Sequence, residues 1–205
     1  MSTPFYRGTK SNVKNKIARL LIAPSTYNIP VQLSEIINLT TYNPNSTYGF
    51  EDMGYTLEPV ALSVTTEQAA FTVEQEGEIK SHPTEQRHVV RTVLAEVTMA
   101  NRSKLFASDA AEAVSGASPA ENRMRISRPK SLPTYRLAVV SLDEELDKIS
   151  GVIYPKVQAS ASAMEESWSR ADATRLAAEF NAYPNDDNFN DAEGNPVIRI
   201  DLEQA

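Results

Sequence analysis

The sequence predicts a mainly β protein, built as a β-sandwich or partial barrel of two packed sheets with one α-helix, an extended N-terminal arm and a long assembly loop. Two observations carry this prediction. Several runs alternate apolar and polar side chains with a period of two, and one run has helical spacing behind a capping residue. At 205 residues, 41% of them hydrophobic, the chain has the size of a single domain, 1–205.

The N-terminal part of the chain is basic. Residues 1–34 contain no acid and five bases, so we interpret 1–16 as an arm that leads into a first strand at 17–23, ended by Pro24. The early apolar run is too short for a signal peptide or a membrane helix, so we expect no membrane contact and a cytosolic protein, or one released by lysis.

Residues 40–55 consist mostly of turn-forming residues, with aromatic side chains between them. A loop of this length without secondary structure is usually functional or unfolded until it binds. Aromatic rings bury large areas, so we expect this segment to be mobile in a free subunit and to order against its neighbour. The candidates for inter-subunit contact are Tyr42, Tyr48, Phe50 and Tyr55.

Alternation continues from 55 to 98 and predicts three antiparallel strands, at 60–64, 71–76 and 88–98, with a break at His82-Pro83. Residues 101–114 are predicted to form the helix, capped by Asn101 or Ser103.

The C-terminal half is predicted to continue as strands. We expect a loop at 116–131 and strands at 134–141, at 152–158 with an interruption at Pro155, and at 197–202. The region 160–180 is ambiguous: helix-forming composition favours a helix, while 173–183 also fits a strand that runs into Pro184.

Motifs for catalysis and cofactor binding are missing from the sequence. There is no cysteine, which excludes disulfides and thiolate metal sites. The seven glycines are scattered, and neither HExxH nor GxSxG occurs. Asp186, Asn188 and Asn190 have calcium-loop spacing, but Asp191 and Val197 stand where that loop needs Gly and Glu. We therefore expect no enzyme activity, no cofactor and no metal.

Glu74, Glu76 and Glu78 alternate along one predicted strand, which places three carboxylates on one face. A glycosidase would need two carboxylates facing each other across a cleft, not stacked along one edge. The alternative without a specific function is that these three carboxylates form a solvated strand face.

Three stretches together resemble the major tail tube protein of long-tailed bacteriophages. A glycine-led strand pair follows the long loop, with GYTLEPVALSV at 54–64 and FTVEQEG at 71–77. The stretch VLAEVTMAN at 93–101 resembles the family's strand that ends in an acid and leads into its single helix. The segment 157–184, which closes with AEFNAYP, resembles the paired C-terminal strands of that family.

The resemblance implies a structural virion protein that assembles with copies of itself into hexameric rings. Strands from the subunits would join into an inner barrel, and the rings would stack into a tube, an architecture shared with type VI secretion tubes. Double-stranded DNA would pass through without specific binding, and the partners would be tape-measure, tail terminator and baseplate proteins. The resemblance also favours a hairpin at 160–180 and makes the Glu74, Glu76 and Glu78 face a candidate lumen lining.

The charge distribution fits stacked rings. Acids outnumber bases 27 to 20, giving a net charge of -7, which argues against a general polyanion binder. Positive charge gathers at 1–34 and 123–136, and negative charge at 143–147 and 185–203. Each exposed pair would contribute only about 0–1 kcal/mol. The candidates for inter-ring charge contacts are Arg7, Lys10, Arg123, Arg125, Asp143 and Glu144.

Three other interpretations remain open. The chain fits another virion part, namely a tail terminator, a baseplate hub, a capsid decoration protein or the inner tube of a contractile tail. A carboxylate hydrolase would pair Glu74 with Glu96 or Asp172 beside Trp168. A nucleic-acid-binding module would use residues 1–19 and 123–130.

Overall fold

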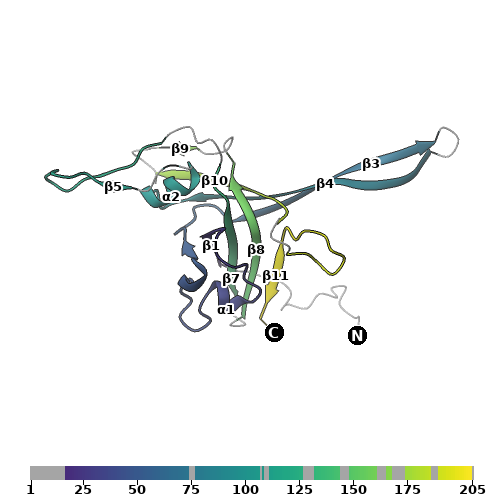
Figure 1. Cartoon of the computed structure of the whole chain (residues 1–205), viewed down its shortest axis with the longest axis horizontal. Coiled ribbons are helices and arrows are strands. Elements are labelled where there is room, and N and C mark those ends of the chain that lie inside the picture. The colour runs from purple at the N-terminus through teal and green to yellow at the C-terminus, as the bar shows by residue number, and fades with distance from the viewer. Residues whose placement is uncertain are drawn as a thin grey trace, which may run out of the picture.

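A computed structural model describes residues 17–73, 77–106, 108, 111–126, 132–143, 148–160, 165–167, 174–185 and 189–204 (Figure 1). The fold is mainly β, as predicted. It consists of a nine-stranded antiparallel sheet, a separate two-stranded sheet and one helix of more than a single turn. The described residues form no closed barrel.

The large sheet has the order β2-β1-β7-β8-β10-β4-β3, with β11 beside β8 and β9 beside β10. Its strands are β1 (Ile17–Pro24), β2 (Glu51–Asp52), β3 (Ala61–Val73), β4 (Gly77–Leu94), β7 (Tyr135–Asp143), β8 (Lys148–Ala159), β9 (Glu166–Ser167), β10 (Arg175–Ala182) and β11 (Ile200–Glu203). The remaining elements are α1 (Leu33–Ile36), the 3-10 turn η2 (Ser46–Tyr48), α2 (Met99–Leu105), β5 (Glu112–Ala113) and β6 (Asn122–Arg123).

Strands β1 and β7 are apolar on both faces because both faces are covered. Leu20 and Leu137 point into a core shared with β4, β10 and α2, while Leu21 and Ala138 point into a second core under α1. Strand β10 pairs with β8 over three residues only, from Phe180 to Ala182. The β10–β4 part of the sheet therefore turns away and crosses over the β1–β7–β8 part (Figure 1).

Strand β8 runs without interruption through Pro155, contrary to the expected break. The register against β7 shifts at this point, so Pro155 lies in a bulge where its missing N–H costs no ladder bond. The buried Arg136 guanidinium holds the bulge: its Nη1 donates to the Pro155 carbonyl (3.1 Å), and its Nε donates to the Tyr27 carbonyl (2.8 Å).

The region 55–98 contains two long strands rather than the three that were predicted. Strand β4 continues through His82 and Pro83, and Pro83 sits beside a register shift, where a proline is tolerated. The predicted helix at 101–114 was also wrong in its bounds. It begins after Thr98, whose hydroxyl accepts the Asn101 N–H (3.1 Å), and it ends at Leu105.

Two further predictions are corrected or decided. The expected loop at 116–131 contains the turn of a hairpin, because β5 pairs with β6. In the ambiguous region 160–180, the described residues favour the hairpin: Ser167 of β9 lies opposite Arg175 of β10. Tertiary pairing here overrides the helical propensity of the segment.

Candidate functional site

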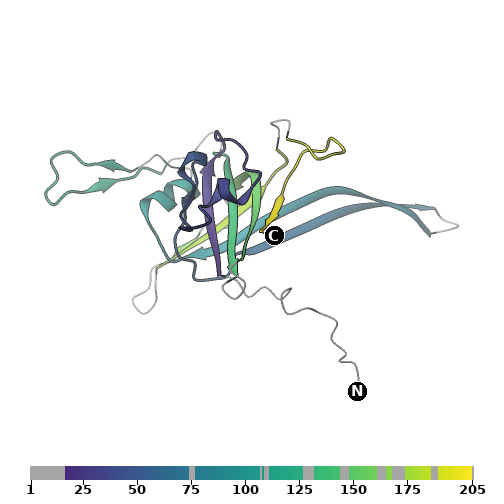
Figure 2. The same ribbon diagram turned by 90° about the horizontal axis from the view of Figure 1, so that it is seen from below.

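The most prominent surface feature is a long hairpin formed by β3 and β4, which projects from the body of the molecule (Figure 2). Its root is anchored in the core: Leu62 packs against the core and Val90 is fully buried. Farther out, three residues of each strand, 65–67 and 85–87, are exposed. We call the projecting part, residues 65–73 and 77–87, the arm.

The arm receives little support from the rest of the described chain. The pairing of β10 with β4 ends where Ala182 meets His88, so beyond that point each arm strand has one described partner, the other. A two-stranded hairpin alone in water is marginally stable at best. An additional surface that packs on the arm would stabilise it.

A buried histidine lies where β4 leaves the body. His88 is 6% exposed, and its ring meets the Tyr154 ring edge to face at a centroid distance of 5.9 Å. Neither ring nitrogen has a hydrogen-bond partner. Burial lowers the pKa of His88, the positive charge of Arg199 lowers it further, and Asp201 opposes both. The root of the arm therefore contains a histidine that is disfavoured in its charged form.

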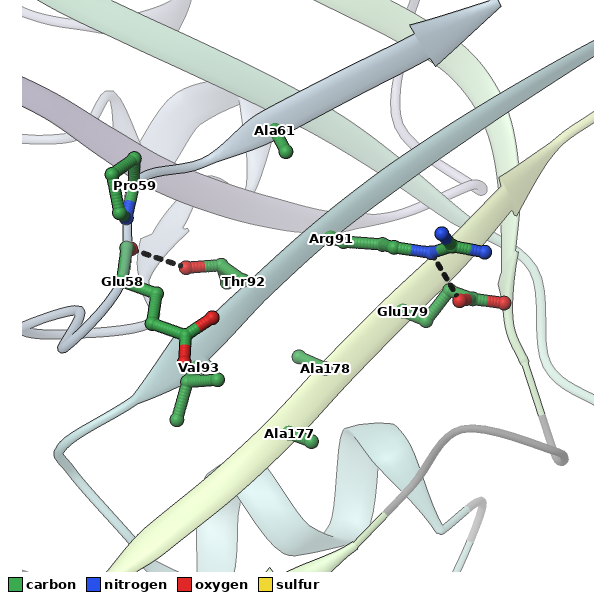
Figure 3. Close-up of a pocket in the computed structure, with 9 residues that line it drawn as sticks. All are labelled: Glu58, Pro59, Ala61, Arg91, Thr92, Val93, Ala177, Ala178 and Glu179. Atoms are coloured by element: carbon green, nitrogen blue, oxygen red, sulfur yellow. Dashed lines mark hydrogen bonds and ion pairs between the residues drawn. The ribbon is translucent and has the colours of Figure 1, made fainter. Parts of the chain in front are cut away.

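A shallow groove lies beside this root, on the outer face of β4 and β10 (Figure 3). It encloses about 320 Å³, and small side chains such as Ala61 and Ala177 form part of its lining. Arg91 Nε donates to Glu179 Oε2 across the groove at 2.5 Å. Although burial raises the pKa of Glu179, hydrogen bonds from Ser160 and Arg91 lower it overall. The carboxylate is therefore held ionised as a structural partner of the arginine.

A second cavity, of about 580 Å³, lies between the β1 edge and the end of β4. Arg19 Nε donates to Asp52 Oδ2 (2.8 Å), and Glu96 Oε1 accepts the Tyr55 N–H (3.1 Å). Gly54 has a φ of +85°, and a Cβ there would meet the Glu96 carboxyl carbon at 2.3 Å. The carboxylates of Asp52 and Glu96 thus both help to hold the chain in its turn beside this cavity. The Tyr55 side chain stays 81% exposed at the rim of the cavity.

Residues 40–55 do not form a structureless loop. They contain η2 and β2, and Phe50 is 3% exposed because it packs in the core under α1. Tyr48 donates its hydroxyl to Glu35 Oε1 (2.7 Å), and Tyr42 packs against the same core. Tyr55 is the exposed member of the four aromatic residues, so their predicted role between subunits stays a prediction that fits Tyr55 best.

Many of the predicted charged residues lie outside the described part of the chain. These are Arg7, Lys10, Glu74, Glu76 and Glu144, together with Asp172 and Trp168 of the hydrolase hypothesis. The backbone of Glu78 lies in β4 opposite Thr72, and Asp143 ends β7, but their side chains are not described. The structure therefore places the backbone of Glu78 and of Asp143 near strand ends, and the predicted roles of both residues stay predictions.

Arg123 and Arg125 lie on or next to the small β5–β6 hairpin. Both approach one carboxylate of the same hairpin: Arg123 Nη2 lies 3.2 Å and Arg125 Nη2 lies 3.9 Å from Glu112 Oε2. All three side chains are more than half exposed, so these pairs add little stability. A role in contacts between rings stays a prediction.

Within the described residues, no group of three or more acidic or histidine side chains is placed to hold a metal ion. None of the described helices combines the length and the apolar character needed to cross a membrane. Comparison with known proteins finds no matching family model and no matching curated protein.

Proposed function

We propose that this protein is a structural subunit that polymerises with copies of itself into stacked, hexameric rings and so forms a tail tube that conducts phage DNA. The observation that carries the proposal is the arm: a long projecting hairpin that is exposed on both faces at 65–67 and 85–87 and whose edge strand β3 has no second described partner. Unpaired strand edges are templates for pairing with another chain. The resemblance of the sequence to tail tube proteins supports the same conclusion.

In this proposal the subunit is a partial barrel, or a sandwich of two layers, that neighbours complete. The layers are the two crossed parts of the large sheet, with the larger core between them. Strands from adjacent subunits would continue the sheet at the arm and close a wall around the tube. β3 ends at Val73 and β4 begins at Gly77, so Glu74, Glu76 and Glu78 belong to the connection between the two arm strands and the start of β4 rather than to one strand face. In this proposal these carboxylates would line the lumen and let DNA slide past.

Hydrogen bonding along the arm provides the energy for assembly. Each main-chain hydrogen bond contributes a net of about 0.5–1.5 kcal/mol. Several such bonds per neighbour, repeated around a ring, offset the cost of bringing subunits together. Head-to-tail contacts of this kind close into rings or extend as filaments.

Size measurement by light scattering and negative-stain electron microscopy test the proposal. The wild-type protein is expected to form rings or tubes. A variant in which Asn-Gly replaces residues 66–86 joins Thr65 to Arg87 through a two-residue turn and removes most of the arm. It is expected to keep the circular dichroism spectrum of a folded β protein and to remain a monomer.

The control shortens the other projecting hairpin, in which Ala113 lies opposite Asn122, by replacing residues 114–121 with Asn-Gly. This variant is expected to form single rings, whether or not the rings still stack. A wild-type protein that stays monomeric at all concentrations, or an armless variant that still forms rings, would contradict the proposed function.

A further inference from the structure

We infer that a second copy of the chain adds a strand to the β3 edge of the arm, and that the β4 edge stays bare. This inference rests on the proposed self-assembly and goes further, because it selects one of two edges. Among the described residues, β3 has a free edge along Ala61–Val73, and β4 has one from Gly77 to Arg87, beyond its pairing with β10.

The β4 edge carries the features that natural proteins use to prevent strand addition. Pro83 has no N–H to donate to an added strand. Two register shifts against β3 leave one β4 residue without an opposite residue each time, at Thr84 and at Ile79. Bulges of this kind disrupt the regular ladder that an incoming strand needs. The same stretch is also rich in charge, with Glu78, Lys80, Glu85 and Arg87.

The β3 edge lacks these features. Its sequence, ALSVTTEQAAFTV, contains no proline and no glycine, and Glu67 is its one charged residue. Threonine, valine and phenylalanine are good strand formers. Every β3 residue from 61 to 73 has an opposite residue on β4, so both shifts place the extra residue on β4. A long, regular edge with one charge is the kind that pairs readily with another strand.

The rest of the sheet indicates that the added strand comes from a second copy. Among the described residues, the sheet is unfinished at both ends: β3 has no outer partner, and at the other end β2 and Met53 cover Leu20–Ile22 of β1, while Ala18 and Arg19 lie beyond them at the mouth of a cavity. One chain therefore carries both halves of a head-to-tail pairing. Pairing of β3 with β3 about a two-fold axis is less favourable, because full overlap of 61–73 places Glu67 opposite Glu67.

Hydrogen exchange measured by mass spectrometry separates the two edges. In dilute monomer, amides that point from either edge into solvent exchange fast. In the assembled protein, exchange in peptides covering 61–73 is expected to slow at least tenfold for the amides at the edge, while exchange in 77–87 stays unchanged. Slower exchange in 77–87, or unchanged exchange in both, would overturn the inference but leave the proposed assembly standing.

A matched pair of variants provides an independent test. Thr66 and Gln86 lie opposite each other in the arm and are both exposed, so Thr66→Lys and Gln86→Lys add the same charge at the same distance from the body. Thr66→Lys is expected to raise the concentration needed for assembly at least tenfold, and Gln86→Lys less than twofold. Equal effects would overturn the inference.

Two further outcomes distinguish a failure of this inference from a failure of the proposed function. In the two-fold pairing with Glu67 opposite Glu67, Thr66 of one copy faces Gln68 of the other. When Thr66→Cys and Gln68→Cys subunits are mixed, a disulfide between the two variants, in a chain that has no other cysteine, would overturn the head-to-tail pairing. A protein that never associates would overturn both the inference and the proposed function.

Discussion

His88 and Asn101 show how single buried polar side chains fix the junctions of this fold. Asn101, 4% exposed, donates through Nδ2 to the main-chain carbonyls of Met53 (2.9 Å) and Glu96 (2.8 Å). It thereby ties the start of α2 to the segments before β3 and after β4. The sequence suggested Asn101 as the N-cap of the helix. In the structure Thr98 is the N-cap, and the Asn101 side-chain amide cross-links two main-chain segments.

Removing the two side-chain hydrogen bonds of Asn101 is expected to destabilise the fold. In Asn101→Ala, the buried Met53 carbonyl and the partly buried Glu96 carbonyl lose their donor, and a buried unsatisfied group costs about 1–3 kcal/mol. Urea denaturation should therefore show a free energy of unfolding about 2–4 kcal/mol lower than in the wild type. In the control, Ser103→Ala, the lost bond from Ser103 Oγ to the Ala100 carbonyl is exposed, and a change below about 0.5 kcal/mol is expected. Equal losses in the two variants would contradict the role assigned to Asn101.

The buried His88 predicts a loss of stability in mild acid. Burial and the Arg199 charge lower its pKa in the folded protein, with Asp201 opposing, so the unfolded chain binds the proton more readily. The free energy of unfolding is expected to fall as pH drops below about 6.5, with a slope of at most about 1.4 kcal/mol per pH unit from this one group. The fall ends once the pH is below the folded pKa.

Urea denaturation at pH 7, 6 and 5 measures this slope, and His88→Phe is the test variant. A phenyl ring keeps the edge-to-face contact with Tyr154 but does not titrate, so the slope between pH 7 and 5 should become much smaller. Glu179, whose pKa is lowered overall, acts in the same direction but at lower pH: the stability it adds is lost as the pH falls below about 4.5. An unchanged slope in His88→Phe would show that another group titrates.

At the scale of elements, the segment 40–55 behaves as part of the body. Phe50 anchors it in the core under α1, so Phe50→Ala is expected to lower the free energy of unfolding by about 3–5 kcal/mol. Tyr55→Ser removes a side chain that is 81% exposed and should change stability by less than about 0.5 kcal/mol. Thermal unfolding of both variants checks the contrast, and a Tyr55→Ser variant that fails to assemble would support an inter-subunit role for Tyr55.

Elements whose strands are buried could be predicted from the sequence. Strands β1 and β7 each contain a continuous apolar run, LLIA at 20–23 and LAVV at 137–140, and both strands lie near the predicted positions. The full length of the arm was missed because Thr65, Thr66 and Glu67 are exposed, so no apolar periodicity marks that stretch. Pro83 was interpreted as a break, since the sequence does not reveal that the pairing of β10 with β4 ends at His88 and that β4 has no other described outer neighbour at Pro83. The lengths of these strands are set by the strands that pair with them rather than by the local sequence preference for strand or turn.

At the scale of the whole molecule, the sheet has different ends. One end carries the arm with the regular β3 edge, and the other carries β1 with the two-residue β2. The resemblance of the sequence to tail tube proteins implied that strands of neighbouring subunits join, but it did not indicate which strands do so. A chain with two unlike ends assembles with a fixed orientation, so every subunit in a ring would face the same way around it.

That asymmetry makes an armless copy a chain terminator. In the proposed assembly, a subunit in which Asn-Gly replaces residues 66–86 would keep its β1 end for a neighbour but would present no β3 edge of its own. Mixed with wild-type protein, this variant is expected to inhibit assembly even as a minor fraction, because each ring that contains it stays incomplete. The mean polymer mass measured by light scattering would fall as the fraction of the variant rises. The same dose of Gln86→Lys subunits would be incorporated harmlessly, and growth would continue past them.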